Sequence, residues 1–135
     1  MTKPSVIALV VCDAVYADPN GKAALIGLFN AIHTGVLPVR HPRLCVYASV
    51  TDVRPGMVFR LRLVHAETES VVAELKGPPP PAIQPTTVLD FQFVLDNLVF
   101  KEPGRYYIEF WGNDYVLAQR PFEVVVRQKK AEGKP

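Results

Sequence analysis

Short apolar runs separated by turn residues constrain this chain more than any other feature of its sequence. In the clearest run, three apolar side chains alternate with two arginines: Phe59, Arg60, Leu61, Arg62 and Leu63. A period of two places alternate side chains on opposite faces of an extended strand, whereas a helix repeats its apolar positions every three or four residues. This run therefore predicts a half-buried β-strand.

The same reasoning predicts about eight strands along the chain. They cover residues 5–17, 23–32, 43–52, 57–65, 71–76, 89–96, 105–112 and 116–126. Turn residues separate them, most clearly Asn20-Gly21, because both of these residues tolerate the positive φ of a tight hairpin. Short strands at spacings of about 10–15 residues predict an all-β fold, a single antiparallel β-sandwich of Ig-like or C2-like type.

The apolar positions of these strands predict one shared core. Its expected members are Leu9, Ile26, Phe29, Val46, Phe59, Leu61, Leu63, Phe91, Phe93, Tyr106, Ile108, Phe122 and Val124. Two charged residues, Asp13 and Arg120, lie between apolar neighbours in their strands. Because an unpaired buried charge is costly, we expect Asp13 to meet Lys22, Arg43, Arg120 or a backbone N–H group.

Length and composition predict one globular domain. The chain has 135 residues, 49% of them hydrophobic, and a net charge of only +2, which argues against disorder. Its longest apolar run, residues 6–12, is far shorter than the roughly 20 residues that a transmembrane helix needs. We therefore expect a β-sandwich domain over residues 1–127, a basic flexible tail over residues 128–135, and no membrane span.

The positive charge of the chain lies near its C-terminus. Residues 127–135 carry a net +3, so residues 1–126 together carry −1 of the total of +2. A nucleic-acid-binding domain usually has a basic stripe on its own surface. We therefore expect no nucleic acid among the partners, and instead expect another protein or further copies of this chain.

The two cysteines bear on the cellular compartment. Cys12 and Cys45 both lie in apolar runs, where a free cysteine behaves as a small buried hydrophobe. The residues before Cys12 resemble a lipoprotein leader only faintly, because the apolar stretch is shorter than usual and Val11 stands where a small residue is expected. We expect a cytoplasmic protein with both thiols reduced.

Motifs of known catalytic or metal sites do not occur in the sequence. It has no Gly-x-Ser-x-Gly nucleophile motif and no glycine-rich phosphate loop. The histidines His33, His41 and His65 lack the spacing of a zinc chelate, although His33 and His41 share one predicted loop and leave a two-ligand site as an alternative. We expect a non-enzymatic protein without a cofactor.

Consecutive aromatic residues place one ring of each pair outside the core. If Tyr106 and Phe110 face inward on their strand, Tyr107 and Trp111 face outward. Two exposed rings on one face would suit a sugar ring or a protein partner. The alternative is that the loop carrying Tyr115 covers Trp111.

Residues 6–12 are apolar on both faces of their predicted strand, whereas a sandwich strand normally exposes one face to water. The second face of this strand must be covered by a loop such as residues 33–42, by the proline-rich segment 77–81, or by another copy of the chain. Residues 78–81 within that segment form either a recognition loop or a rigid crossover between strands. We favour another copy. The predicted interaction surface comprises Ile7, Leu9, Val11, Tyr107, Trp111 and Tyr115.

Several ordered motifs run through most of the chain. They are Cys12-Asp13-x-Val15, Asp18-x-x-Gly21-Lys22-x-x-Leu25-Ile26-Gly27-x-Phe29-x-x-Ile32, His41-Pro42-x-Leu44-x-Val46-Tyr47, Asn97-Leu98-x-Phe100-x-x-Pro103-Gly104-x-Tyr106 and Leu117-Ala118-x-Arg120-Pro121-Phe122. Together they resemble a family of small, uncharacterised bacterial proteins, a domain of unknown function, over residues 7–126. The resemblance implies a bacterial β-sandwich with no recorded catalytic residues.

These observations predict a non-enzymatic protein-interaction or assembly module. The alternative is a β-sandwich that uses its exposed aromatic rings to bind a carbohydrate or another small molecule.

Overall fold

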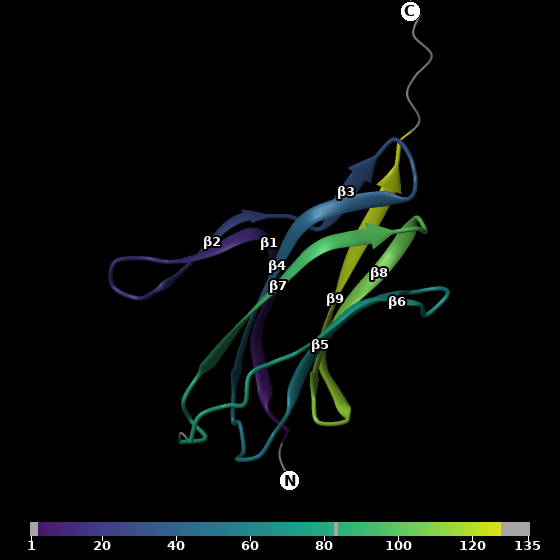
Figure 1. Cartoon of the computed structure of the whole chain (residues 1–135). Helices are drawn as coiled ribbons and strands as arrows, with labels where there is room; N and C mark the ends of the chain where they lie inside the picture. Colours follow the sequence, from purple (N-terminus) through teal and green to yellow (C-terminus); the bar gives the residue numbers. More distant parts are fainter. Residues whose placement is uncertain (1–2, 83, 128–135) are drawn as a thin grey trace, which may run out of the picture.

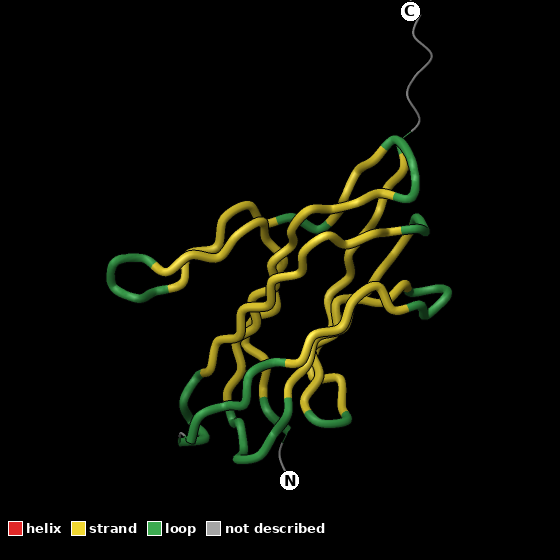
Figure 2. The backbone as a smooth tube through the Cα atoms, viewed as in Figure 1, coloured by secondary structure: helices red, strands yellow, loops and turns green. Residues whose placement is uncertain are grey.

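The computed structural model describes residues 3–82 and 84–127, which form nine strands and no helix (Figures 1 and 2), so the all-β prediction is confirmed. The predicted tail, residues 128–135, lies outside the described residues. The strands are β1 (Ser5–Ala17), β2 (Ala23–Leu28), β3 (Ala31–Thr34), β4 (Val39–Thr51), β5 (Phe59–His65), β6 (Val71–Lys76), β7 (Leu89–Phe100), β8 (Gly104–Gly112) and β9 (Tyr115–Val126).

The strands form two sheets that face each other across one core. Sheet A has the order β2-β1-β4-β7, and sheet B has the order β3-β9-β8-β5-β6. Among the described strands every pairing is antiparallel except that of β3 with β9, which is parallel. The prediction of a purely antiparallel sandwich is therefore corrected to two mostly antiparallel sheets. Residues 78–81 lie on the crossover from β6 in sheet B to β7 in sheet A.

The predicted strand over residues 23–32 is in fact two strands in different sheets, which is why there are nine strands rather than about eight. β2 ends at Leu28, and the chain crosses to sheet B before β3 begins. Phe29 marks the crossing, because its backbone N–H donates to the Val11 carbonyl oxygen (3.2 Å) and its ring meets that of Phe122 edge-on, with centroids 5.8 Å apart. Ile26, predicted in the core, is 52% exposed. It lies in the β1–β2 hairpin, which projects from the sandwich (Figure 1).

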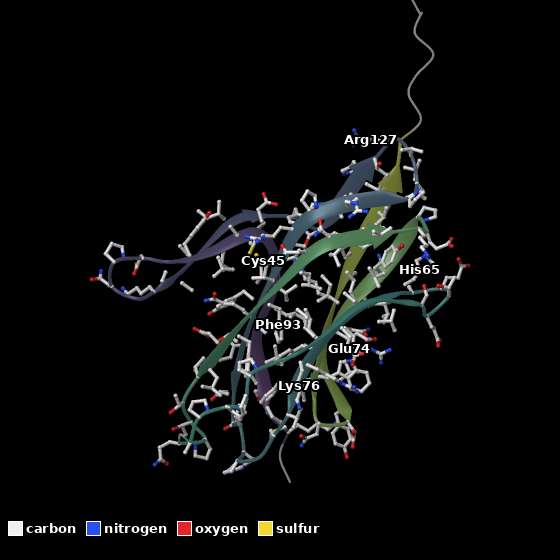
Figure 3. All side chains as sticks on the ribbon, viewed as in Figure 1. Cys45, His65, Glu74, Lys76, Phe93 and Arg127 are labelled. Carbon is white, nitrogen blue, oxygen red and sulfur yellow. The ribbon has the colours of Figure 1, made fainter. Side chains whose placement is uncertain are left out.

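The core lies between the inner faces of the two sheets. Phe59 in sheet B stacks on Phe110 of the neighbouring strand, with ring centroids 5.5 Å apart, and also meets Phe91 of sheet A at 4.9 Å. Phe93 points into the same space from β7 (Figure 3). The alternation predicted for β5 is confirmed, because its burial pattern alternates between Phe59 and Leu63.

The alternation of β1 is interrupted near its start. The β1–β4 register shifts between Val6 and Ala8, which is a β-bulge or a similar irregularity, and a bulge changes which side chains face the core. Val11 is completely buried, Leu9 is partly buried against the core, and Ile7 is 58% exposed. The three residues that the sequence placed on one face therefore lie in three different environments.

Arg120 ties the two sheets together. Its Nη1 donates to the Leu9 carbonyl oxygen in sheet A (3.0 Å), and its Nη2 donates to Oδ1 of Asn30. The Asp13 carboxylate instead occupies the space that a side chain at Gly27 would need, and Gly27 has a positive φ of 73°. Asp13 and Arg120 thus lie in separate environments. Position 27 requires glycine both because its φ is positive and because the Asp13 carboxylate fills the space of a side chain.

Candidate functional site

A cluster of polar and aromatic side chains lies on the outer face of sheet B. We call it the Trp111 surface, and its members come from three adjacent strands: Arg60 and Arg62 on β5, Glu74 on β6, and Tyr107, Glu109 and Trp111 on β8. Register brings them together, because Arg60 pairs with Trp111 and Arg62 pairs with both Glu109 and Glu74. Side chains of paired residues leave a sheet on the same face.

Two arginines lie on the Trp111 ring. The guanidinium carbon of Arg60 is 4.5 Å from the ring centroid, and that of Arg62 is 5.6 Å from it, which are cation–π distances. The indole Nε1 donates to Oε1 of Glu109 (3.0 Å), which fixes the orientation of the ring. The predicted outward direction of Tyr107 and Trp111 thus holds, since both are half-buried while their neighbours in β8 are buried.

The outward-facing Trp111 ring is not bare, because the guanidinium groups of Arg60 and Arg62 lie over it. A sugar could stack on this ring only after displacing a guanidinium group. The surface therefore presents an arginine–tryptophan stack, with the arginine donors at its rim.

Glu74 links the two arginines from the neighbouring strand. It pairs with Arg60 (3.1 Å) and with Arg62 (3.8 Å). All three side chains are partly exposed, so the pairs add little to stability. Their effect is to hold both guanidinium groups in one orientation.

A hollow of about 260 Å³ adjoins this surface, and its lining includes Arg62, Tyr107 and Trp111 of the surface together with His65. His65 is buried at the end of β5 (Figure 3). Its Nδ1 accepts from the backbone N–H of Thr68 (3.1 Å), so its Nε2–H is the donor to the Pro103 carbonyl oxygen (2.9 Å). Both ring nitrogens are thus used in holding two turns together.

The other predicted site residues lie elsewhere. Tyr115 is 57% exposed in the β8–β9 hairpin, where the Lys3 ammonium lies 4.7 Å from its ring centroid. It pairs with Gly112, the residue after Trp111, and lines a different cavity. Ile7, Leu9 and Val11 belong to sheet A. The structure therefore brings together Tyr107 and Trp111, and separates the other four from them.

Sequence reasoning missed Arg60, Arg62 and Glu74 as site residues. The alternation of β5 already turned both arginines to the outer face. The sequence pattern does not show the β5–β8 register, which pairs residues about fifty positions apart in the chain.

The described residues 3–82 and 84–127 contain no group of three His, Cys, Asp or Glu side chains that could hold a metal ion. His33 and His41, the alternative two-ligand pair, border the same shallow cavity. Nor does the described part of the chain include a helix long and apolar enough to cross a membrane.

The sequence profile of a family of unknown function, DUF6941, matches residues 7–125. The chain belongs to this family. The resemblance to a domain family of unknown function, predicted from the ordered motifs, is confirmed over nearly the same residues. No curated protein matches this DUF6941 chain.

A solved structure has a similar fold. It is the Pseudomonas fluorescens alkylpurine DNA glycosylase AlkC bound to DNA containing an abasic site analog, with a TM-score of 0.56 and 13% sequence identity. The similarity covers 91% of this DUF6941 chain but only 30% of the glycosylase chain. At this identity the likeness concerns the fold.

We expected another protein or further copies of the chain as partners, and no nucleic acid; the exclusion of nucleic acid must be corrected. A protein with a similar fold is bound to DNA. The sum of charges over residues 1–126 gave no ground for the exclusion, because it cannot show that Arg60 and Arg62 lie side by side on one face.

Proposed function

We propose that this chain is a non-enzymatic protein-interaction module that binds its partner through the Trp111 surface. The observation that carries the proposal is the stack of Arg60 and Arg62 on the Trp111 ring. Tryptophan, tyrosine and arginine are the residues that most often dominate binding energy at interfaces. Because this stack is already ordered, binding would immobilise few further side chains.

The charges of the surface support a partner with groups of both signs. Arg60 and Arg62 offer donors at the rim, while Glu74 and Glu109 offer acceptors between them. Complementary charges of this kind set the orientation and specificity of a protein complex more than its affinity.

A second candidate is contact with nucleic acid, and the observation that favours it is the DNA-bound structure of similar fold. Guanidinium groups bind phosphate oxygens, and Arg60 and Arg62 present two such groups on one face. In this case binding would weaken steeply as salt is raised, since phosphate contacts release counterions.

We propose the Ig-like rather than the C2-like type of sandwich. The order β9-β8-β5-β6 is that of strands G, F, C and C′ in immunoglobulin variable domains, and β1, β4 and β7 correspond to A, B and E. The Tyr106 hydroxyl donates to the Glu102 carbonyl oxygen four residues upstream, which matches the tyrosine corner of such domains.

We also propose a cytoplasmic location for this protein, and the free thiols of Cys12 and Cys45 support this proposal.

The experiment compares the wild type with Trp111→Ala and with Tyr16→Ala, a control in which an exposed ring on β1 is removed. Proteins captured by each form from the source cells are quantified, and the best candidate is purified and titrated calorimetrically. We expect Trp111→Ala to weaken binding about 30-fold, a typical hot-spot loss of about 2 kcal/mol, and Tyr16→Ala to leave it unchanged.

The nucleic acid candidate is tested on the same variants by fluorescence anisotropy with single- and double-stranded DNA at low and high salt. Salt-sensitive binding that needs Trp111 would replace the protein proposal with the nucleic acid one. If no protein and no DNA depends on Trp111, the surface is not the binding site and both candidates fail.

A further inference from the structure

A second cavity, of about 370 Å³, lies at the opposite end of the sandwich from the β7–β8 turn. It is formed where the β4–β5 connection, the β8–β9 turn and the start of β1 come together, at the lower end of the molecule in Figure 1. Its volume falls in the range of small-molecule sites. It is separate from the Trp111 surface, with which it shares no lining residue.

The floor and one wall of this end cavity are apolar. Met57 and Leu117 line it and pack against the core behind it, and the Tyr115 ring adds a further apolar surface. A methyl group at Gly112 would lie 2.7 Å from Leu117 Cδ1 and 3.2 Å from Met57 Cε. Glycine at this position therefore leaves room for the side chains of Leu117 and Met57.

The charged side chains that line the end cavity are both cations. Lys3 and Arg54 both line it, and none of its described lining residues is acidic. The Lys3 ammonium lies 4.7 Å from the centroid of the Tyr115 ring, so one cation is placed directly beside the apolar wall. An apolar space with cations at its rim is complementary to an apolar molecule that carries an anionic group.

We propose that the end cavity binds a small amphiphilic anion, an apolar body of aromatic or short aliphatic carbon that carries one carboxylate or sulfonate group. The body lies over Met57 and Leu117 against the Tyr115 ring, and the anionic group faces the Lys3 ammonium beside that ring. This site does not depend on the proposed protein interaction, since it shares no lining residue with the hollow at the Trp111 surface.

The test uses the intact chain and a fluorescent probe of this chemistry, 8-anilino-1-naphthalenesulfonate. We expect saturable binding to one site, competition by decanoate, and little competition by decanol or by acetate, which each lack one half of the recognised chemistry. Lys3→Gln is expected to weaken probe binding several-fold, because it removes the charge next to the ring.

Tyr115→Ala locates the site, and Tyr16→Ala is its matched control, because the two tyrosines are exposed to nearly the same extent, 57% and 60%. We expect at least a fivefold loss of affinity in Tyr115→Ala and none in Tyr16→Ala. Both side chains are exposed, so neither variant should unfold, and circular dichroism checks this. Equal binding to both variants, or equal competition by decanol and decanoate, would overturn the proposal.

Discussion

The guanidinium carbon of Arg60 lies 4.5 Å from the centroid of the Trp111 ring, and the two residues are register partners in adjacent strands. The contact is therefore fixed by the β5–β8 ladder and does not depend on a loop. Arg62, two residues along the same strand, approaches the same ring at 5.6 Å. A ring held in this way is ordered before any partner arrives, which is the physical basis of the proposed function.

Removing one of these cations should cost a measurable amount of stability. We expect Arg60→Ala to lower the free energy of unfolding by about 0.5–1 kcal/mol, the range for a partly exposed cation–π contact. Arg43→Ala is the control, because Arg43 forms an exposed ion pair with Asp96 that involves no ring, and exposed pairs contribute little. Urea unfolding measures both, and equal losses in the two variants would contradict the account.

The irregularity in β1 predicts opposite outcomes at two apolar positions of one strand. Val11→Lys should unfold the chain, because it places an unpaired charge in a closed core. Ile7→Lys should leave the melting temperature nearly unchanged, because Ile7 is already largely exposed. Thermal unfolding followed by circular dichroism measures the melting temperature of each variant. A folded Val11→Lys variant, or an unfolded Ile7→Lys variant, would show that the inner face of β1 is wrongly assigned.

Both thiols should be protected in the folded chain. Burial raises the pKa of the Cys12 thiol above its ordinary value of 9.0, and burial likewise raises that of Cys45. Since the thiolate is the reactive form, Ellman's reagent at pH 8 should react slowly with the native chain and quickly with two groups per chain in guanidinium chloride. Fewer than two groups in the denatured chain would reveal a disulfide, and would count against the cytoplasmic location.

Stability should fall at alkaline pH. Burial raises the pKa of the Tyr106 hydroxyl above its ordinary value of 10.0, so the unfolded chain releases this proton at a lower pH than the folded chain does. The contribution of this group is complete below pH 10 and is lost as the pH rises through the folded-state pKa. Cys12 and Cys45 act in the same direction, starting nearer pH 9.

Urea unfolding between pH 8 and 11 tests this prediction, with Tyr106→Phe as the comparison. This variant should be less stable at pH 8, because the Glu102 carbonyl oxygen loses its donor, but it should lose less stability as the pH rises. An identical pH dependence in both chains would mean that Tyr106 does not titrate as described.

Local patterns in the sequence were enough to predict the strands, and contacts between distant strands were not. The alternation around Arg60 and Arg62 fixes which side chains face outward, because it depends only on neighbouring residues. That these arginines lie on Trp111 depends on the β5–β8 register, which no local pattern encodes. Tyr115 was grouped with Trp111 for the same reason, since closeness in the sequence does not show that the two line different cavities.

One residue in the sequence, Gly27, indicates the irregular backbone just before the chain changes sheets after β2. Gly27 interrupts an apolar run, and an isolated glycine within a strand pattern often marks a bulge or a close approach of another group. Here it marks the close approach of the Asp13 carboxylate, and its φ is positive, at 73°. The register shift near the start of β1 has no comparable marker, because every residue from Val6 to Val11 is apolar.

The most direct test of the Trp111 surface uses the fact that the chain has a single tryptophan. Its indole N–H, which donates to Glu109, gives one side-chain signal in an ¹H–¹⁵N correlation spectrum. On titration with the purified partner, we predict that this signal shifts progressively and reaches saturation together with the backbone amides of Arg60, Arg62 and Tyr107. An indole signal that stays unchanged while the amides of the β1–β2 hairpin move would contradict the account.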